Sequence, residues 1–219
     1  FVLAHALYKA PLFFIAGNVD LAAGTRVLDE IGSLGRRMRI TALAAGMAGI
    51  SMAGLPLSFG YVAKDVIKIS KSNGEVFWWV AYAGVFVSVL SVAAAAIATI
   101  RVFGMTGEPR PAKAREGSIA TWLPPLFIAA FGLLLGIFPS LVHDLLSFAA
   151  ADMGSSQTIG ELRVTMDNTA RLSALAMTLG GGVVIFLAWD RLHAARRKIP
   201  DSLSAIVWYQ RWLRAIPWV

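Results

Sequence analysis

Long apolar stretches separated by shorter polar segments dominate this chain of 219 residues. The stretches occupy residues 1–16, 41–55, 59–70, 76–103, 119–140 and 172–189. Several of them approach or exceed the roughly 20 apolar residues that a helix needs to cross a bilayer. Pro56 and Gly60 interrupt the backbone where the second stretch meets the third. The pattern therefore predicts an all-α integral membrane protein with about six transmembrane helices, one of which is broken.

Polar segments connect these stretches. Residues 17–40 are expected to form a long loop, and residues 104–117, which are rich in proline and charge, a second one. Residues 141–153 continue the fifth stretch as an amphipathic segment. Lysine and arginine are similarly frequent in alternate loops, so the charge bias that orients membrane proteins gives no orientation here.

The pattern changes after residue 190. A cluster of basic residues is followed by Trp208, Tyr209 and Trp212, which are interleaved with further arginines. Aromatic and basic side chains in this mixture are typical of a helix that lies in the membrane interface. We therefore expect a transmembrane core over residues 1–190 and a basic, aromatic, amphipathic interfacial helix over residues 191–219. Both ends of the chain interrupt a segment, so we expect a piece of a longer protein.

The composition agrees with a membrane protein and excludes other classes. Hydrophobic residues make up 57% of the chain and charged residues 15%, against roughly 45–50% and 25% in soluble domains. Without cysteine, the chain has no disulfide framework, Cys-ligated zinc or iron–sulfur cluster. The net charge is +7, but the basic residues lie mostly between the apolar stretches, where they contact lipid headgroups. We expect a lipid bilayer as a partner and no nucleic acid.

No pattern for enzyme chemistry is present in the sequence. A phosphate-binding loop, a zinc pattern and a nucleophile elbow are all missing. We therefore expect no cofactor, no metal and no catalytic residue. The remaining candidates are ionisable side chains inside apolar stretches, where burial of a charge costs at least about 2.5–3.5 kcal/mol and is usually functional.

The first candidate is a pair in the first stretch. His5 and Lys9 are four residues apart and share one helix face. A buried amine can both take and give a proton, and histidine titrates near neutral pH. The pair therefore suits a proton relay in which water bridges the two groups. In the alternative interpretation, Lys9 extends toward the interface and His5 is simply hydrogen-bonded.

The second candidate is Lys64, followed by Asp65, just after the break at Pro56 and Gly60. Broken membrane helices lie against protein or a wet cavity because the freed backbone groups need partners. In transporters such breaks mark ion sites. The alternative is that Lys64 and two later lysines line the end of a helix. Asp65 is expected to be a counter-charge or a cap.

Two supporting candidates are weaker. Asp20 is expected to be a loop or capping residue. Ser51 could hydrogen-bond water in a channel, although membrane hydroxyls usually bond between helices or to their own backbone.

Gly132 and Gly136 form a GxxxG pair that predicts close helix packing.

Both candidate places contain familiar motifs. Residues 5–13, His-Ala-Leu-Tyr-Lys-Ala-Pro-Leu-Phe, and residues 51–65, with Ser-Met-Ala-Gly-Leu-Pro followed by Gly-Tyr-Val-Ala-Lys-Asp, resemble two helices of the antiporter-like membrane subunits. That superfamily includes the proton-pumping subunits of respiratory complex I and the large subunits of Mrp-type cation/proton antiporters. Residues 20–26 resemble a segment of the A-type subunits within the Mrp branch. Leu21 and Val27 stand where that family usually has His and Asp.

The resemblance implies the second half of a 14-helix core. His5 and Lys9 would be its central relay groups, and Lys64 would be the lysine of its broken helix. It also implies a multisubunit Na⁺/H⁺ antiporter in a prokaryotic cell membrane, with other membrane subunits as partners and H⁺ and Na⁺ as the ions. Two alternatives remain open: a proton-pumping subunit of complex I or a membrane-bound hydrogenase, and a membrane scaffold that transports nothing.

Overall fold

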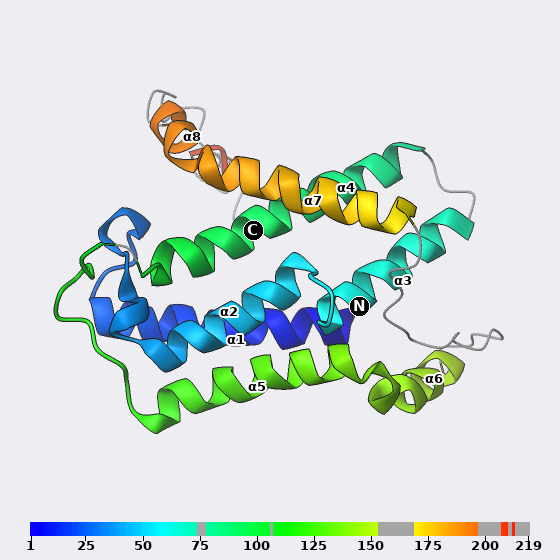
Figure 1. Cartoon of the computed structure of the whole chain (residues 1–219), viewed down its shortest axis with the longest axis horizontal. Helices are drawn as coiled ribbons and strands as arrows, with labels where there is room; N and C mark the ends of the chain where they lie inside the picture. The colour runs from blue at the N-terminus through cyan, green and yellow to red at the C-terminus, as the bar shows by residue number, and fades with distance from the viewer. Residues whose placement is uncertain (74–77, 106, 153–168, 197–206, 210–211, 213–219) are drawn as a thin grey trace, which may run out of the picture.

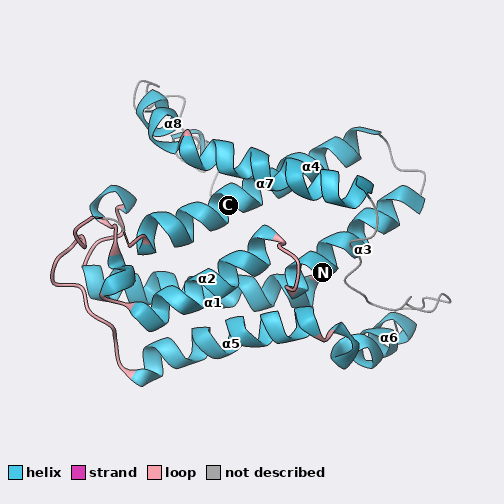
Figure 2. Ribbon diagram, in the orientation of Figure 1, coloured by secondary structure: helices cyan, strands magenta, loops and turns pink. Residues whose placement is uncertain are grey.

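The computed structural model describes residues 1–73, 78–105, 107–152, 169–196, 207–209 and 212, and the regular elements within these ranges are helices (Figures 1 and 2). The longer ones are α1 (Val2–Ala23), α2 (Arg39–Ala53), α3 (Phe59–Asn73), α4 (Trp78–Ala96), α5 (Ile119–Ile137), α6 (His143–Asp152), α7 (Thr169–Leu187) and α8 (Trp189–Arg196). A π-helical turn, Ile97–Arg101, extends α4. The predicted all-α class is confirmed.

Within the described residues, three helical spans are long and apolar enough to cross a membrane, namely Val2–Ala23, Tyr82–Arg101 and Ile119–Ile137. A fourth is possible if Leu172–Leu187 and Trp189–Ala195, which meet at a bend of 56°, count as one span. The number is lower than the predicted six because α2 and α3 have 15 residues each. At 1.5 Å per residue each is about 22 Å long, short of a hydrocarbon core of about 30 Å.

The first helix is longer than the sequence predicted. We expected a loop from residue 17, but α1 continues to Ala23 and ends at Gly24, whose φ of 69° is left-handed. The polar residues in the added turns have partners. The Asn18 amide donates to the Thr121 carbonyl at 2.7 Å, and Asp20 accepts from Arg26 at 2.8 Å. Asp20 is therefore helical rather than a loop residue.

The helices pack in two groups. Helices α1, α2 and α5 lie side by side, and α4 pairs with α7 next to them (Figure 1). Of the predicted glycine pair on α5, Gly136 lies at a close contact and Gly132 at an ordinary one. A Cβ on Gly136 would come within 2.3 Å of the Ser58 backbone, and one on Gly132 would lie 3.5 Å from the Leu7 Cβ. Only glycine lets α5 approach the segment before α3 this closely.

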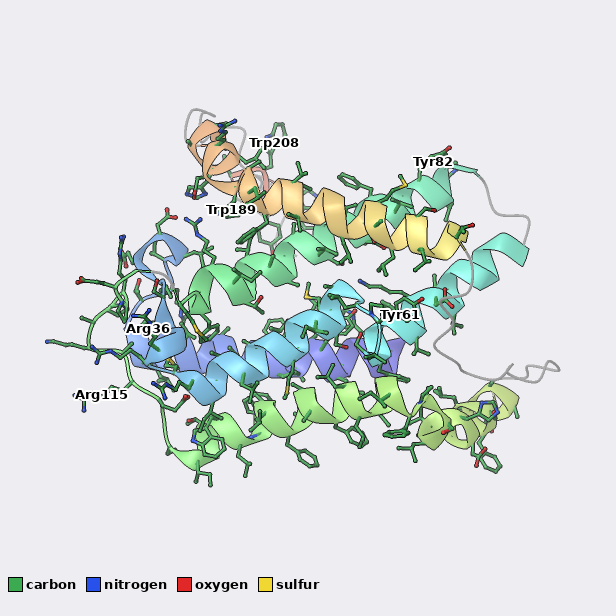
Figure 3. All side chains as sticks on the ribbon, in the orientation of Figure 1. Arg36, Tyr61, Tyr82, Arg115, Trp189 and Trp208 are labelled. Carbon is green, nitrogen blue, oxygen red and sulfur yellow. The ribbon has the colours of Figure 1, made fainter. Side chains whose placement is uncertain are left out.

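The two long connections, from α1 to α2 and from the π-helical turn to α5, lie at the end of the bundle where α1 ends (Figure 1). Figure 3 shows Arg36 and Arg115 extending from this end, far from Tyr61 at the start of α3. The predicted interfacial helix, residues 191–219, falls largely outside the described residues. Within the described part, Trp208, Tyr209 and Trp212 are exposed.

Candidate functional site

The backbone between α2 and α3 changes direction over residues 54–58. Gly54 ends α2 with a left-handed φ of 75°, and Leu57 also has a positive φ, 67°. The Ser58 hydroxyl donates to the Leu55 carbonyl at 2.6 Å and accepts the Tyr61 N–H at 3.3 Å, which caps the start of α3. The interruption that Pro56 predicted is therefore present.

The expectation that Gly60 interrupts the backbone was wrong, because Gly60 lies inside α3. Its role is contact: a Cβ at this position would come within 1.9 Å of the Ser51 carbonyl oxygen. The Gly60 N–H donates to the Ser51 hydroxyl at 3.3 Å, and Ser51 is buried. Ser51 thus joins the two helices across the break.

Lys64 reaches back over the break to the end of α2. Its Nζ donates to the Met52 carbonyl at 2.7 Å. A helix end leaves its last carbonyls unpaired and partly negative, so it is a favourable place for an ammonium. Gly54 makes room for the lysine, since a Cβ there would lie 2.9 Å from the Lys64 Cδ. Asp65, the next residue, is buried, with 8% of its surface exposed.

The partner of His5 is a residue that the sequence analysis did not consider. His5 is exposed, and its Nδ1 lies 3.0 Å from the hydroxyl of Tyr8. Tyr8 is buried, with 5% of its surface exposed. Lys9 is half-buried on the same helix. The spacing of three residues from His5 was the one signal that could have pointed to Tyr8.

A cavity of about 610 Å³ is lined by residues of α1, α3, α4 and α7. Its lining includes Tyr8 from α1, Lys64 from α3, and the hydroxyl residues Ser88, Ser91 and Thr178 from α4 and α7. The structure therefore brings Lys64 together with Tyr8. Lys9 is not among the residues that line this cavity.

Asp20 belongs to a different place. It lines a second cavity, of about 530 Å³, together with Thr25 and Arg26 at the loop end of α1. Twelve residues separate it from Tyr8, which is about 18 Å along a helix. The structure therefore separates Asp20 from the cavity at Lys64.

A group of charges near α8 is a further feature that the sequence did not indicate. Arg101 lies 2.7 Å from Asp190 and 3.5 Å from Asp29, and His193 lies 3.2 Å from Asp29. Trp189 lies at the bend after α7 (Figure 3), and its ring stacks on that of His193. These contacts join the end of α4 to α8 and to the loop after α1. In the described ranges, no cluster of three or more His, Cys, Asp or Glu side chains could hold a metal ion.

The fold and this site define a class: an all-helical membrane protein with ionisable groups on its first helix and beside an interrupted pair of helices. Residues 1–91, from α1 into α4, match the family described as "NADH:quinone oxidoreductase/Mrp antiporter, TM". The match includes His5, Tyr8, Lys9 and Lys64.

Relatives of known name place the chain more narrowly. It is 30% identical to the A1 subunit of the Na⁺/H⁺ antiporter of Staphylococcus haemolyticus (strain JCSC1435) and 29% identical to that of Staphylococcus aureus (strain JH9), over 97% of this chain and 28% of each relative. The structure of the Mrp complex from Dietzia sp. DQ12-45-1b is similar with a TM-score of 0.71 and 26% identity, over 97% of this chain and 24% of that one. The predicted resemblance to the A-type subunits of Mrp-type antiporters is confirmed. The chain spans about a quarter of the length of these relatives.

Proposed function

We propose that this chain is part of a membrane subunit of a multisubunit Na⁺/H⁺ antiporter in a prokaryotic cell membrane. In this proposal the protein belongs to a transporter and is not an enzyme. Its partners are the bilayer and other membrane subunits, and its ions are H⁺ and Na⁺. The similarity to the A1 antiporter subunits over 97% of the chain supports the assignment.

The proposed architecture joins α2 and α3 into one broken span. The six apolar stretches then correspond to α1–α5 and α7, which form the core over residues 1–190. Residues 191–219 form the interfacial helix. The exposed aromatic residues Trp208, Tyr209 and Trp212 support this division.

Protons pass, in this proposal, through water between His5, Lys9 and Lys64. The observation that carries it is the position of the Lys64 amine, on the Met52 carbonyl at the end of α2 and at the edge of a cavity. Two ammonium groups in a low-dielectric interior repel one another, so a proton on one lysine disfavours a proton on the other. In this proposal, the coupling drives proton movement in one direction against the movement of a second cation, sodium, in the other. Asp65, Ser51 and Asp20 have supporting roles.

Replacement of the two lysines tests the proposal. We expect Lys9→Ala and Lys64→Ala, each in the complete complex in membrane vesicles, to abolish the pH change that sodium addition produces. Lys113→Ala is the control, because Lys113 is exposed in the loop before α5. Sodium-dependent exchange retained in either lysine variant would overturn the proposed proton path.

A redox-driven proton pump is the second candidate, because the matching family also includes NADH:quinone oxidoreductase. The same residues would then move protons with energy from electron transfer. The two functions differ in what drives transport. Proton movement by sodium addition alone supports the antiporter, whereas a strict need for an electron donor supports the pump.

A further inference from the structure

Tyr8 occupies the position between the exposed His5 and the cavity at Lys64. Its ring is buried in α1, with 5% of the residue exposed, and its hydroxyl lies 3.0 Å from the Nδ1 of His5. The same residue lines the 610 Å³ cavity that Lys64 also lines. Tyr8 thus contacts His5 and lines the same cavity as Lys64.

Tyr8 and Lys64 are held by one residue of α2. Met52 packs with Tyr8 and Ala95 in one buried apolar cluster. The carbonyl of the same Met52 accepts the hydrogen bond from the Lys64 Nζ at 2.7 Å. The phenol and the ammonium therefore both lie against the last turn of α2, and their positions depend on the same element.

Hydroxyl groups of α4 and α7 also line the cavity. Ser88 donates to the Gly84 carbonyl at 2.8 Å, and Thr178 donates to the Leu175 carbonyl at 2.9 Å. Each hydroxyl that donates to its own helix keeps its oxygen lone pairs for a further donor. Most of the other lining residues are apolar, so these hydroxyls, Tyr8 and Lys64 are the polar groups that cavity water would use. A cavity water needs two to four such partners.

We propose that Tyr8 is a relay residue, which passes protons between His5 and the cavity water that reaches Lys64. This inference rests on the proposed function of the lysines. A protonated His5 gives its Nδ1 proton to the Tyr8 oxygen while the original hydroxyl proton leaves for a cavity water. The O–H bond that forms replaces the one that breaks, so the phenol is neutral before and after the step. The proton then binds the Lys64 amine in its neutral form, and the reverse sequence releases it.

The test is Tyr8→Phe in the complete complex in vesicles, because phenylalanine keeps the ring in the cluster with Met52 and removes only the hydroxyl. We expect the rate of sodium-driven proton movement to fall about tenfold or more, as for the loss of a proton-transfer group. Tyr82→Phe is the matched control, since Tyr82 is 71% exposed on α4, and it should leave the rate unchanged. The double variant His5→Ala/Tyr8→Phe should be no slower than the slower single variant, because both residues serve one path.

A second measurement covers the case in which Tyr8→Phe assembles poorly. A fluorinated tyrosine at position 8 keeps the size and the hydrogen bond but is a stronger acid, so it should change the rate of sodium-driven proton movement. A rate equal to that of the unchanged protein would overturn the role of Tyr8. If the Tyr8 variants match the unchanged protein while Lys64→Ala loses transport in the same assay, only this inference is overturned. If Lys64→Ala retains transport, the proposed function fails as well.

Discussion

The carboxylate of Glu116 accepts the backbone N–H of Ile40 at 2.8 Å, although 76 positions separate the two residues. The same carboxylate accepts the Thr41 N–H at 3.4 Å and the Thr41 hydroxyl. The first N–H groups of a helix have no partner within the helix and carry partial positive charge. A residue in the loop before α5 therefore caps α2, the helix whose other end binds Lys64.

Removal of this cap should destabilise the bundle. We expect Glu116→Ala to lower the free energy of unfolding by about 1–3 kcal/mol, because it leaves buried donors without a charged acceptor. Glu116→Gln, which keeps one acceptor oxygen, should cost less. The measurement is the thermal stability of the purified protein in detergent. Glu108→Ala, an exposed glutamate in the same loop, should have no effect, and an equal loss in both alanine variants would contradict the capping role.

Gly54 gives a test of the link between the end of α2 and Lys64. Gly54→Ala places a methyl group 2.9 Å from the Lys64 Cδ and strains a φ of 75°. Gly24 is the matched control, because its φ is 69° but a Cβ there meets nothing within 4 Å. Both variants should lose about 1–2 kcal/mol from backbone strain.

The two variants should differ in their transport rate. Only Gly54→Ala should also slow sodium-driven proton movement, because it displaces the lysine from the Met52 carbonyl. Equal transport rates in the two variants would show that the position of Lys64 does not matter.

Gly60 should accept no side chain. A Cβ at this position would lie 1.9 Å from the Ser51 carbonyl oxygen, and backbone cannot move aside as a flexible side chain can. We expect Gly60→Ala to prevent α3 from packing against α2, with a large loss of assembled protein in the membrane. Gly46→Ala in α2 meets nothing within 4 Å and should be neutral or slightly stabilising. Normal assembly of Gly60→Ala would show that the contact between the helices is looser than described.

Sequence patterns predicted the features that depend on neighbouring residues. The apolar stretches gave the positions of most helices. Pro56 predicted the interruption between α2 and α3, and Gly136 of the predicted glycine pair makes a close contact with the backbone at the start of α3. Each of these follows from hydrophobic length or backbone freedom, which a short segment determines by itself.

Features that depend on distant segments could not be predicted. The extension of α1 beyond residue 16 requires the Thr121 carbonyl of α5 as a partner for Asn18. The place of Tyr8 beside a cavity requires α3, α4 and α7 to surround it. The contacts of Arg101 with Asp190 join residues 89 positions apart. Nothing in the local sequence of these residues indicates such partners.

The transport rate of Lys64→Arg tests the central claim most directly. Arginine keeps the positive charge and can donate to the Met52 carbonyl, but it does not release its proton in proteins. If Lys64 carries protons, sodium addition to vesicles with the Lys64→Arg complex should produce no pH change, although the complex assembles. If Lys64 only holds the end of α2, arginine should restore exchange to near the unchanged rate, and that result would contradict the account.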